Sequence, residues 1–506
     1  MPLSSKHLIN DSSKLLKENQ IIKVRNLKVN FKVKDGLLQA VRGIDLSVYK
    51  GQIIGIVGES GSGKSVSVKS LIGFNDGANI EANNLNLSNI DILKIKKKDW
   101  CYIRGTYVSY IPQDPLMSLN PTKTIGRQVI EAIYASEKNK YKQKVYELKE
   151  KMSCGGDEGI ELKRQLNEKT DKYNEILKSK KEQFDKDKRS LKESLDNNSI
   201  DQEAYKSSLK SLEEQYKESV NNATNVYNET KNTLSERIKQ LSQLNKGNYE
   251  AEIQEAKNTY INNTKKDVAK KKVIEILEFI GIENAVSRLN AYPHEFSGGM
   301  RQRIVIAIAV ATQPDVIIAD EPTTALDVTI QAKVLSLIKK LREIYGITVI
   351  FISHNIALVA NFCDYIYVMY AGKIVEQGLT EEIFTNPLHP YTWALLESIP
   401  DSSDGANQKL KPIDGTPPNL VTPPKGDAFA ARNKYAIALD FEKQPPLFEV
   451  TDTHRAATWL LHPKAPKVEV PKEVQEKINK SKKAFEIYVK QKKENQTYII
   501  PDKNSK

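Results

Sequence analysis

Apolar runs alternate with helical patterns in two stretches of the chain, residues 21–135 and 271–400. Runs such as Ile53–Val57, Val316–Ala319 and Ile347–Ile352 are apolar at almost every position. A strand buried on both faces shows such a continuous run instead of alternation. Because helical patterns separate the runs, the two stretches predict an α/β fold with a mostly parallel sheet covered on both faces.

A very different composition fills residues 137–270, which are rich in Lys, Glu, Asn, Gln and Ser and lack proline. Single large apolar residues recur near the helical and heptad spacings, namely Leu162, Leu166, Tyr173, Leu177, Phe184, Leu191 and Leu195, then Leu209, Leu212, Tyr216, Val220, Val226, Leu234, Ile238 and Leu241. A narrow apolar stripe on a polar helix is typical of a coiled coil. The turn formers of Asp196–Ser199 interrupt it and predict an antiparallel helical hairpin with its tip near residues 196–200. Disorder is the alternative, because the stripe is thin and its surroundings are very polar.

Turns marked by proline and glycine dominate the chain after residue 400, as in Asp414–Pro418 and Thr422–Gly426. They predict a small irregular module, followed by a Lys-rich tail with a helical pattern at 472–493. The predicted division is an N-terminal extension (1–20), an α/β domain in two parts (21–136 and 271–400), the inserted hairpin (137–270), the module (401–465) and the tail (466–506).

The net charge is +12, from 76 Lys and Arg against 64 Asp and Glu. Lysine-rich solvated helices account for this excess, and the alternatives are contacts with nucleic acid or an anionic membrane surface. Aromatic residues do not interleave with the basic ones as they do on nucleic-acid platforms, so we expect no nucleic-acid partner. No stretch approaches the roughly 20 apolar residues of a membrane-spanning helix, and the N-terminus has no secretory apolar core. We therefore expect a chain that neither crosses a membrane nor leaves the cytosol by itself.

The three cysteines, Cys101, Cys154 and Cys363, are far apart and form no CxxC pair. This spacing fits a reducing compartment, without a disulfide framework or a cysteine metal site.

A complete GxxxxGK[ST] motif follows the apolar run 53–57 and precedes a helical pattern at 66–72; its members are Gly58, Glu59, Ser60, Gly61, Ser62, Gly63, Lys64 and Ser65. Its glycines let successive backbone N–H groups point at phosphate oxygens near a positive helix end. Lys64 would reach the β- and γ-phosphates and Ser65 would ligate Mg²⁺. The motif therefore predicts that the chain binds ATP with Mg²⁺.

Two acids, Asp320 and Glu321, end the apolar run that begins at Val316. Asp320 can support the magnesium shell, and Glu321 stands where a general base could polarise the attacking water. Acids at this place can also merely cap a helix. Their order after the phosphate loop favours the nucleotide role.

Four further motifs resemble those of ABC ATPases. Ser297–Arg303 resembles the signature loop, with Phe296 where those proteins usually have Leu. Thr324–Asp327 resembles the D-loop, Ser353-His354 the switch histidine, and Gln113 occupies the Q-loop position. The resemblance implies a P-loop NTPase of the ABC nucleotide-binding type, with a RecA-like core and a helical subdomain.

The resemblance also implies roles for single residues. Phe31 would stack on adenine, and Gln113 would sense magnesium and couple to a transmembrane partner. His354 would stabilise the γ-phosphate and the attacking water, and Asp327 belongs to the nucleotide site. The signature residues Ser297, Gly298 and Gly299 would face the γ-phosphate held by another subunit. Dimerisation is then required, because a monomer lacks half of each site.

A narrower resemblance is to the D-type ATPases of oligopeptide and dipeptide importers. It rests on Gln113–Pro121, Tyr292–Arg303, Ala319–Thr329, His389–Thr392 and Pro417–Leu420. It implies an ATPase that powers peptide uptake from the cytoplasmic face of the cell membrane. The implied partners are a second, F-type ATPase subunit in a heterodimer, two permease subunits and an extracellular peptide-binding protein.

Two features depart from this family. Its C-terminal module often carries four cysteines that ligate an iron–sulfur cluster, but Asp427, Asn433, Asp440 and Thr458 stand at those positions here. Carboxylate, amide and hydroxyl groups do not replace thiolates, so we predict no iron–sulfur cluster. The insertion 137–270 also interrupts the segment that corresponds to the helical subdomain.

Two alternatives stay open at this point. One is a soluble SMC-like DNA-maintenance ATPase, since such proteins also place a coiled coil between the phosphate loop and the signature. The other is an ABC importer for nickel or another small solute, because the binding protein and permease set most of the specificity.

Overall fold

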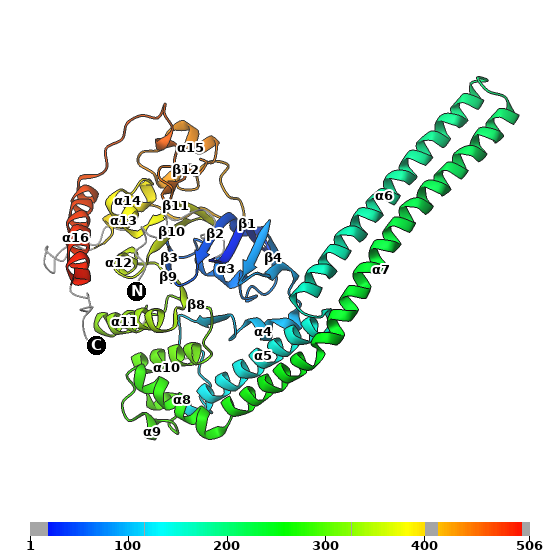
Figure 1. Ribbon diagram of the computed structural model, residues 1–506. Coiled ribbons are helices and arrows are strands. Elements are labelled where there is room, and N and C mark those ends of the chain that lie inside the picture. Colours follow the sequence, from blue (N-terminus) through cyan, green and yellow to red (C-terminus); the bar gives the residue numbers. More distant parts are fainter. Residues whose placement is uncertain (1–18, 116, 325, 400–412, 498–506) are drawn as a thin grey trace. The chain divides into compact units, whose positions relative to one another are not determined.

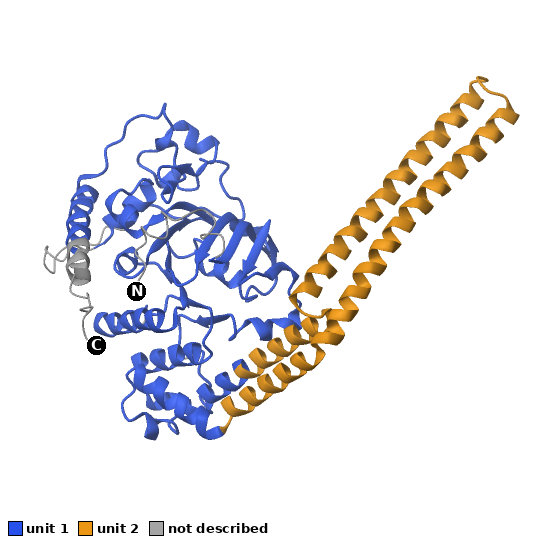
Figure 2. Ribbon diagram, viewed as in Figure 1, with its two compact units in different colours: residues 1–136, 266–506 blue, residues 137–265 orange. Residues whose placement is uncertain are grey.

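The computed structural model describes residues 19–115, 117–324, 326–399 and 413–497. Within these ranges the chain forms two compact units (Figures 1 and 2). The first combines residues 1–136 with 266–506, and the second comprises residues 137–265. The predicted N-terminal extension lies almost wholly outside the described residues.

An eight-stranded sheet in the order β12-β13-β11-β10-β3-β9-β8-β7 is the centre of the first unit. Five neighbouring strands are parallel: β10 (Tyr365–Tyr370), β3 (Ile53–Val57), β9 (Thr348–Ser353), β8 (Val316–Asp320) and β7 (Val108–Ile111). Every residue of β3, β8 and β9 is buried, as the continuous apolar runs predicted. The antiparallel strands β11 (Lys373–Leu379), β13 (Arg455–Ala456) and β12 (Phe448–Glu449) extend one edge, so the C-terminal module joins the main sheet.

A second, antiparallel sheet was not predicted. It consists of β1 (Gln20–Val33), β2 (Gly36–Tyr49), β4 (Ala78–Glu81), β5 (Asn84–Leu87) and β6 (Ile90–Asp91). One face of this sheet is buried, so Ile22 and Val24 are buried while Lys23 is exposed. Register shifts between β1 and β2 further break the alternation, which hid these strands in the sequence.

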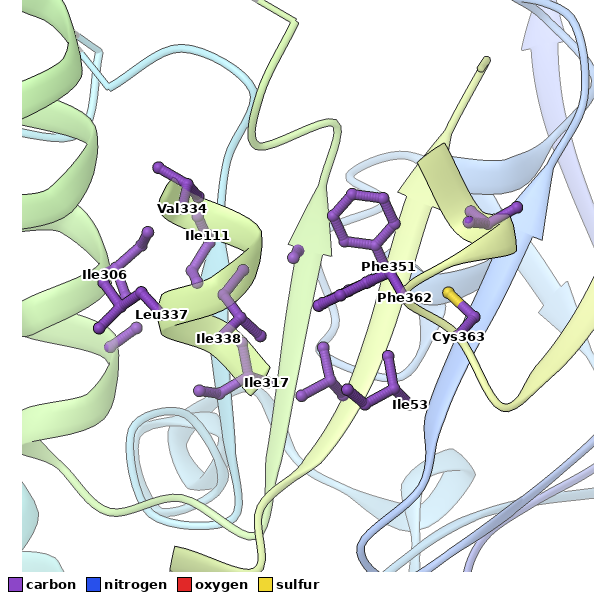
Figure 3. Packing of buried hydrophobic residues seen from close by; sticks show 14 of the residues in the cluster. Ile53, Ile111, Ile306, Ile317, Val334, Leu337, Ile338, Phe351, Phe362 and Cys363 are labelled. Atoms are coloured by element: carbon purple, nitrogen blue, oxygen red, sulfur yellow. The ribbon is translucent and has the colours of Figure 1, made fainter. Parts of the chain in front are cut away.

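The first unit also contains helices, several of which pack against the main sheet. They are α3 (Lys64–Ser70), α4 (Trp100–Ile103), α8 (Lys266–Phe279), α9 (Ala285–Arg288), α10 (Gly298–Ala311), α11 (Val328–Tyr345), α12 (Ile356–Ala360), α13 (Thr380–Thr385), α14 (Pro390–Glu397), α15 (Ala438–Glu442) and α16 (Lys472–Thr497). Figure 3 shows Leu337 and Ile338 of α11 between Ile306 of α10 and Ile317 of β8. This packing fixes α10 and α11, whose N-termini carry the signature and D-loop motifs.

The second unit is the helical hairpin that the apolar stripe predicted, and it is not the disordered alternative. Helix α5 (Ile125–Cys154) runs into it, and α6 (Asp157–Asp196) and α7 (Gln202–Asn263) form its two arms (Figure 2). A break at Gly155 and Gly156 separates α5 from α6 and was not predicted. Both glycines have positive φ, and a Cβ on Gly155 would lie 2.3 Å from the Cβ of Leu241. The close approach of α7 therefore requires glycine at 155.

Aromatic pairs cross the hairpin between its facing helices. The ring centroids of Tyr173 and Tyr227 are 4.3 Å apart, and those of Phe184 and Tyr216 are 4.6 Å apart. Tyr173, Phe184 and Tyr216 belong to the predicted apolar stripe, but Tyr227 does not, and the predicted member Val226 is exposed. In the described part of the chain, no helix combines the length and the hydropathy that crossing a bilayer requires.

Candidate nucleotide-binding site

The phosphate-binding motif forms a tight loop between β3 and α3. Gly58 and Gly63 have φ angles of 153° and 95°. A Cβ on Gly58 would lie 2.1 Å from the carbonyl oxygen of Met369, and one on Gly63 would lie 2.5 Å from that of Ala40. Neighbouring strands therefore leave room only for glycine, and the sequence needs glycine here to shape the loop.

Lys64 begins α3, and its side chain folds back over the loop. Its Nζ donates hydrogen bonds to the carbonyl oxygens of Gly58 at 2.7 Å and Glu59 at 2.9 Å. Burial lowers the pKa of Lys64, and the charges of Glu321, Asp320 and Glu59 oppose that effect. The ammonium group is thus held at the loop that would carry the phosphates.

Ser65 and Asp320 meet although 255 residues separate them. The Ser65 hydroxyl donates to Oδ1 of Asp320 at 2.6 Å, and Tyr110 donates to Oδ2 at 2.7 Å. The Nζ of Lys69 lies 3.5 Å from the same Oδ2. A hydroxyl and a carboxylate oxygen are the kind of ligand that Mg²⁺ takes, so the pair fits the predicted metal position.

Tyr110 is a site residue that the sequence analysis did not single out. Burial, followed by the hydrogen bond to Asp320, raises the pKa of Tyr110, which keeps its hydroxyl protonated as the donor. Its only sequence signal is its place on β7, three positions before Gln113.

The carboxylate of Glu321 contacts three polar groups, two from residues that follow the neighbouring strands β7 and β9 and one from the loop of Glu321 itself. Its Oε2 accepts from Nε2 of Gln113 at 3.3 Å and from Oγ1 of Thr324 at 3.1 Å. The same atom lies 3.0 Å from Nδ1 of His354. Gln113, Glu321 and His354 follow β7, β8 and β9, whose carboxyl ends share one edge of the sheet. The structure thus brings together three residues that the sequence analysis proposed separately.

A cavity of about 180 Å³ borders this cluster. Its lining includes Glu321, Thr324, Gln331, Ser353 and His354. Thr324 belonged to the predicted D-loop, but its contact with Glu321 was not foreseen. The cavity gives room for a water molecule next to the Glu321 carboxylate.

The signature motif opens helix α10. Ser297 is the N-cap residue, and its Oγ accepts from the N–H of Met300 at 3.4 Å. Ser297 and Gly298 are exposed, whereas a Cβ on Gly299 would lie 2.8 Å from Cγ2 of Ile330. Exposed N–H groups at a helix N-terminus can bind an anion. Phe296, at the family's usual Leu position, is buried and serves the core.

Two predicted nucleotide residues have structural partners in this chain. Asp327 caps α11, and its Oδ1 accepts from the N–H of Ile330 at 2.9 Å. Phe31 lies on β1 opposite Leu38 and Ala78, half-buried against the apolar cluster of the second sheet. Their contacts with a nucleotide stay predictions.

The four residues at the cysteine positions each bond to nearby backbone. Asp427 Oδ1 accepts a hydrogen bond from the backbone N–H of Phe429, and Asn433 Oδ1 accepts one from the N–H of Tyr435. Asp440 Oδ2 accepts from the N–H of Ile437, and Thr458 Oγ1 accepts from the N–H of Leu460. The four distances lie between 2.7 and 3.3 Å. All four side chains are buried. Local hydrogen bonds therefore hold these turns, and the donor set does not suit an iron–sulfur cluster.

The fold and the site together define a P-loop ATPase with a signature motif of the ABC type. The sequence profile described as "ABC transporter" matches residues 41–324, more than half of the chain. The profile described as "Oligopeptide/dipeptide transporter, C-terminal region" matches residues 375–438.

Relatives are similar over nearly their whole length. The oligopeptide transport ATP-binding protein OppD of Mycoplasma genitalium is 54% identical over 96% of this chain and 99% of its own. The protein of that name from Mycoplasma pneumoniae is 52% identical over 96% and 94% of the two chains, and that from Bacillus subtilis is 34% identical over 93% and 98%. The chain belongs to the ABC transporter family, as one of its ATP-binding proteins. The predicted resemblance and fold class are thus confirmed, and the SMC-like alternative is not supported.

Proposed function

We propose that this chain binds and hydrolyses ATP to power the uptake of oligopeptides through partner permease subunits. Peptides are favoured over nickel by the match of residues 375–438 to the peptide-transporter C-terminal region and by the names of the relatives from Mycoplasma genitalium and Bacillus subtilis. The observation that carries the ATPase role is the contact of Glu321 with both Gln113 and His354, beside the Ser65–Asp320 pair.

In this proposal Glu321 is the general base. Its Oε2 accepts a hydrogen bond from Gln113 and stands next to His354, so the carboxylate is oriented before a water molecule arrives. Ser65 and Asp320 would hold Mg²⁺, which neutralises phosphate charge when bound. Lys64 would hold the terminal phosphates with the loop amides.

The exposed signature residues support a dimeric mechanism. Ser297 and Gly298 would bind the γ-phosphate held by a second ATPase subunit, which we infer to be an F-type chain. The remaining partners would be two permease subunits and an extracellular peptide-binding protein. The assembly would place this chain on the cytoplasmic face of the cell membrane.

We also propose that the C-terminal module contains no iron–sulfur cluster. The support is chemical, since the four side chains at the cysteine positions are hard oxygen donors already bonded to backbone N–H groups. Iron and acid-labile sulfide in anaerobically purified protein would overturn this proposal.

A purification from the protein's own cells in mild detergent tests the assembly. Mass spectrometry should find two multi-span permease subunits and a second ABC ATPase with the tagged chain. The complex in liposomes should then hydrolyse ATP faster when a loaded peptide-binding protein is added. Stimulation by nickel and not by peptides would reject the substrate class, and recovery without any permease would reject the importer.

A further inference from the structure

The phosphate loop carries a carboxylate, Glu59, which a residue of the C-terminal module neutralises. Arg432 donates from Nη1 to Oε2 of Glu59 at 2.6 Å and from Nη2 to Oε1 at 3.0 Å. This two-pronged geometry is the strongest form of an arginine–carboxylate contact. The two residues are 373 positions apart, and both belong to the first unit.

Every N–H group of the Arg432 guanidinium has a partner. The remaining hydrogens are donated to the Tyr370 hydroxyl at 3.1 Å, to the Ile413 carbonyl at 3.1 Å and to the Asp414 carbonyl at 2.8 Å. The side chain is only 4% exposed. An arginine with all five donors satisfied is fixed in one orientation, so Arg432 is a rigid support for Glu59.

Aromatic rings form a platform around this pair. The guanidinium lies 5.7 Å from the ring of Tyr370 and 5.9 Å from that of Phe429. Tyr391, which is fully buried, packs against both rings. Its hydroxyl oxygen accepts the backbone N–H of Glu59 at 2.7 Å. The loop is thus held at the backbone as well as at the side chain.

The network continues from Glu59 to Lys64. The Glu59 carbonyl accepts from the ammonium of Lys64 at 2.9 Å. Glu59 therefore joins the C-terminal module to the lysine that faces the phosphates. An acid in an anion-binding loop would also repel a nucleotide unless its charge were compensated.

We propose that Arg432 is a positioning residue for ATP binding, which compensates the charge of Glu59 and holds the phosphate loop in its binding shape. The C-terminal module is then part of the nucleotide site, not a separate appendage. The proposal rests on the ATP-binding role of the loop but not on the identity of the transported substrate.

The test is a set of variants in the assembled transporter, with kinetics for Mg-ATP and equilibrium ATP binding. R432Q should raise the KM for ATP about tenfold and change kcat by no more than about twofold, because a displaced phosphate loop weakens the binding of ATP equally in the ground state and the transition state. R432K keeps the positive charge but cannot make the two-pronged contact, so its KM for ATP should lie between those of R432Q and the wild type. K434Q removes a positive charge from an exposed ion pair two positions away and should leave the KM unchanged.

Rescue separates charge compensation from a general structural defect. Adding E59Q to R432Q removes the uncompensated carboxylate and should recover much of the lost ATP affinity. A merely structural role of Arg432 would give no such recovery. A folded R432Q complex with wild-type KM would overturn the proposal, as would a double variant no better than R432Q or an equal effect of K434Q. In the wild-type complex, normal ATP binding without any stimulation by peptide would count against the proposed substrate and would leave the Arg432 proposal standing.

Discussion

The Nδ1 atom of His354 lies 3.0 Å from Oε2 of Glu321, across the carboxyl ends of two adjacent parallel strands. Glu321 has a φ angle of 47°, a left-handed conformation that is uncommon outside glycine. Its N–H donates to the Ile352 carbonyl of the next strand at 3.1 Å, which supports this conformation. The backbone thus aims the carboxylate at the histidine.

Replacing Glu321 by Gln should leave ATP binding intact and lower hydrolysis at least about 100-fold, because an amide cannot accept a proton from water. The amide keeps the size of the side chain and can still bond to His354. Phosphate release and equilibrium ATP binding by the assembled complex measure the two effects. Hydrolysis at the wild-type rate would remove Glu321 from the base role.

Gly63→Ala should abolish ATP binding, because a methyl group would meet the Ala40 carbonyl oxygen at 2.5 Å in a residue with φ of 95°. Relief of that clash must move the loop away from the phosphates. Gly77→Ala is the matched control, since Gly77 lies outside the phosphate loop and also has positive φ, at 73°, but no atom lies within 4 Å of its Cβ position.

The control variant should lose only about 1–2 kcal/mol of stability, because alanine is strained in the left-handed backbone conformation. Titration with ATP and thermal unfolding of both variants test the difference. Equal ATP affinities for the two variants would show that space at position 63 is not limiting.

The linear motifs were predictable because their chemistry depends on neighbours in the sequence. The glycines of Gly58–Ser65 determine the shape of the phosphate loop. Asp320 and His354 come at the ends of apolar runs, and such continuous runs are typical of buried parallel strands. The stripe through Tyr173 and Phe184 likewise predicted the hairpin, because helical spacing is a local property. Family resemblance added Gln113 and Ser297, whose surroundings alone carry little signal.

Contacts between distant segments could not be predicted in this way. Nothing near Arg432 in the sequence points to Glu59, and Tyr110 is one of many tyrosines on buried strands. The strands β1 and β2 were missed because a half-buried sheet with register shifts has no continuous apolar run. Such features depend on which surfaces the tertiary fold brings together.

Asp440→Asn should stabilise the protein at neutral pH. Burial is the main reason that the pKa of Asp440 is raised, and the nearby charge of Asp427 adds to it, although the N–H of Ile437 opposes the shift. A raised folded-state pKa contributes stability at low pH, below the unfolded value, and that contribution is lost as the pH rises through the folded value. Asparagine cannot ionise, yet its oxygen can still accept from the Ile437 N–H.

Calorimetric melting between pH 4 and pH 8 measures this effect. The Tm of the variant should exceed that of the wild type at pH 8, and the difference should shrink towards about pH 4, where carboxyl groups ordinarily protonate. Asp452→Asn removes the same charge from an exposed position of the same module and should change the Tm little. A lower Tm for Asp440→Asn at pH 8 would mean that the charge itself stabilises the module.

The two arms of the hairpin depend on aromatic contacts instead of a broad core. Leu241 is the buried residue of α7 and Gly159 that of α6. The rings of Tyr173 and Tyr227 stack within 4° of parallel. The two hydroxyls also bond outside the pair, that of Tyr227 to Thr170 at 3.0 Å and that of Tyr173 to Thr224 at 2.9 Å.

Tyr227→Ala should therefore destabilise the hairpin by about 1–3 kcal/mol, since it removes both the stacking and a hydrogen bond. Tyr227→Phe loses only the hydroxyl contact and should cost less, and Tyr146→Ala, at an exposed position, should cost little. Amide hydrogen exchange should rise in residues 160–235 of the alanine variant and stay unchanged in the main-sheet strands. Unchanged exchange in both regions would show that the polar helices hold together without this pair, so the stacking of Tyr173 on Tyr227 would not be what aligns the two arms.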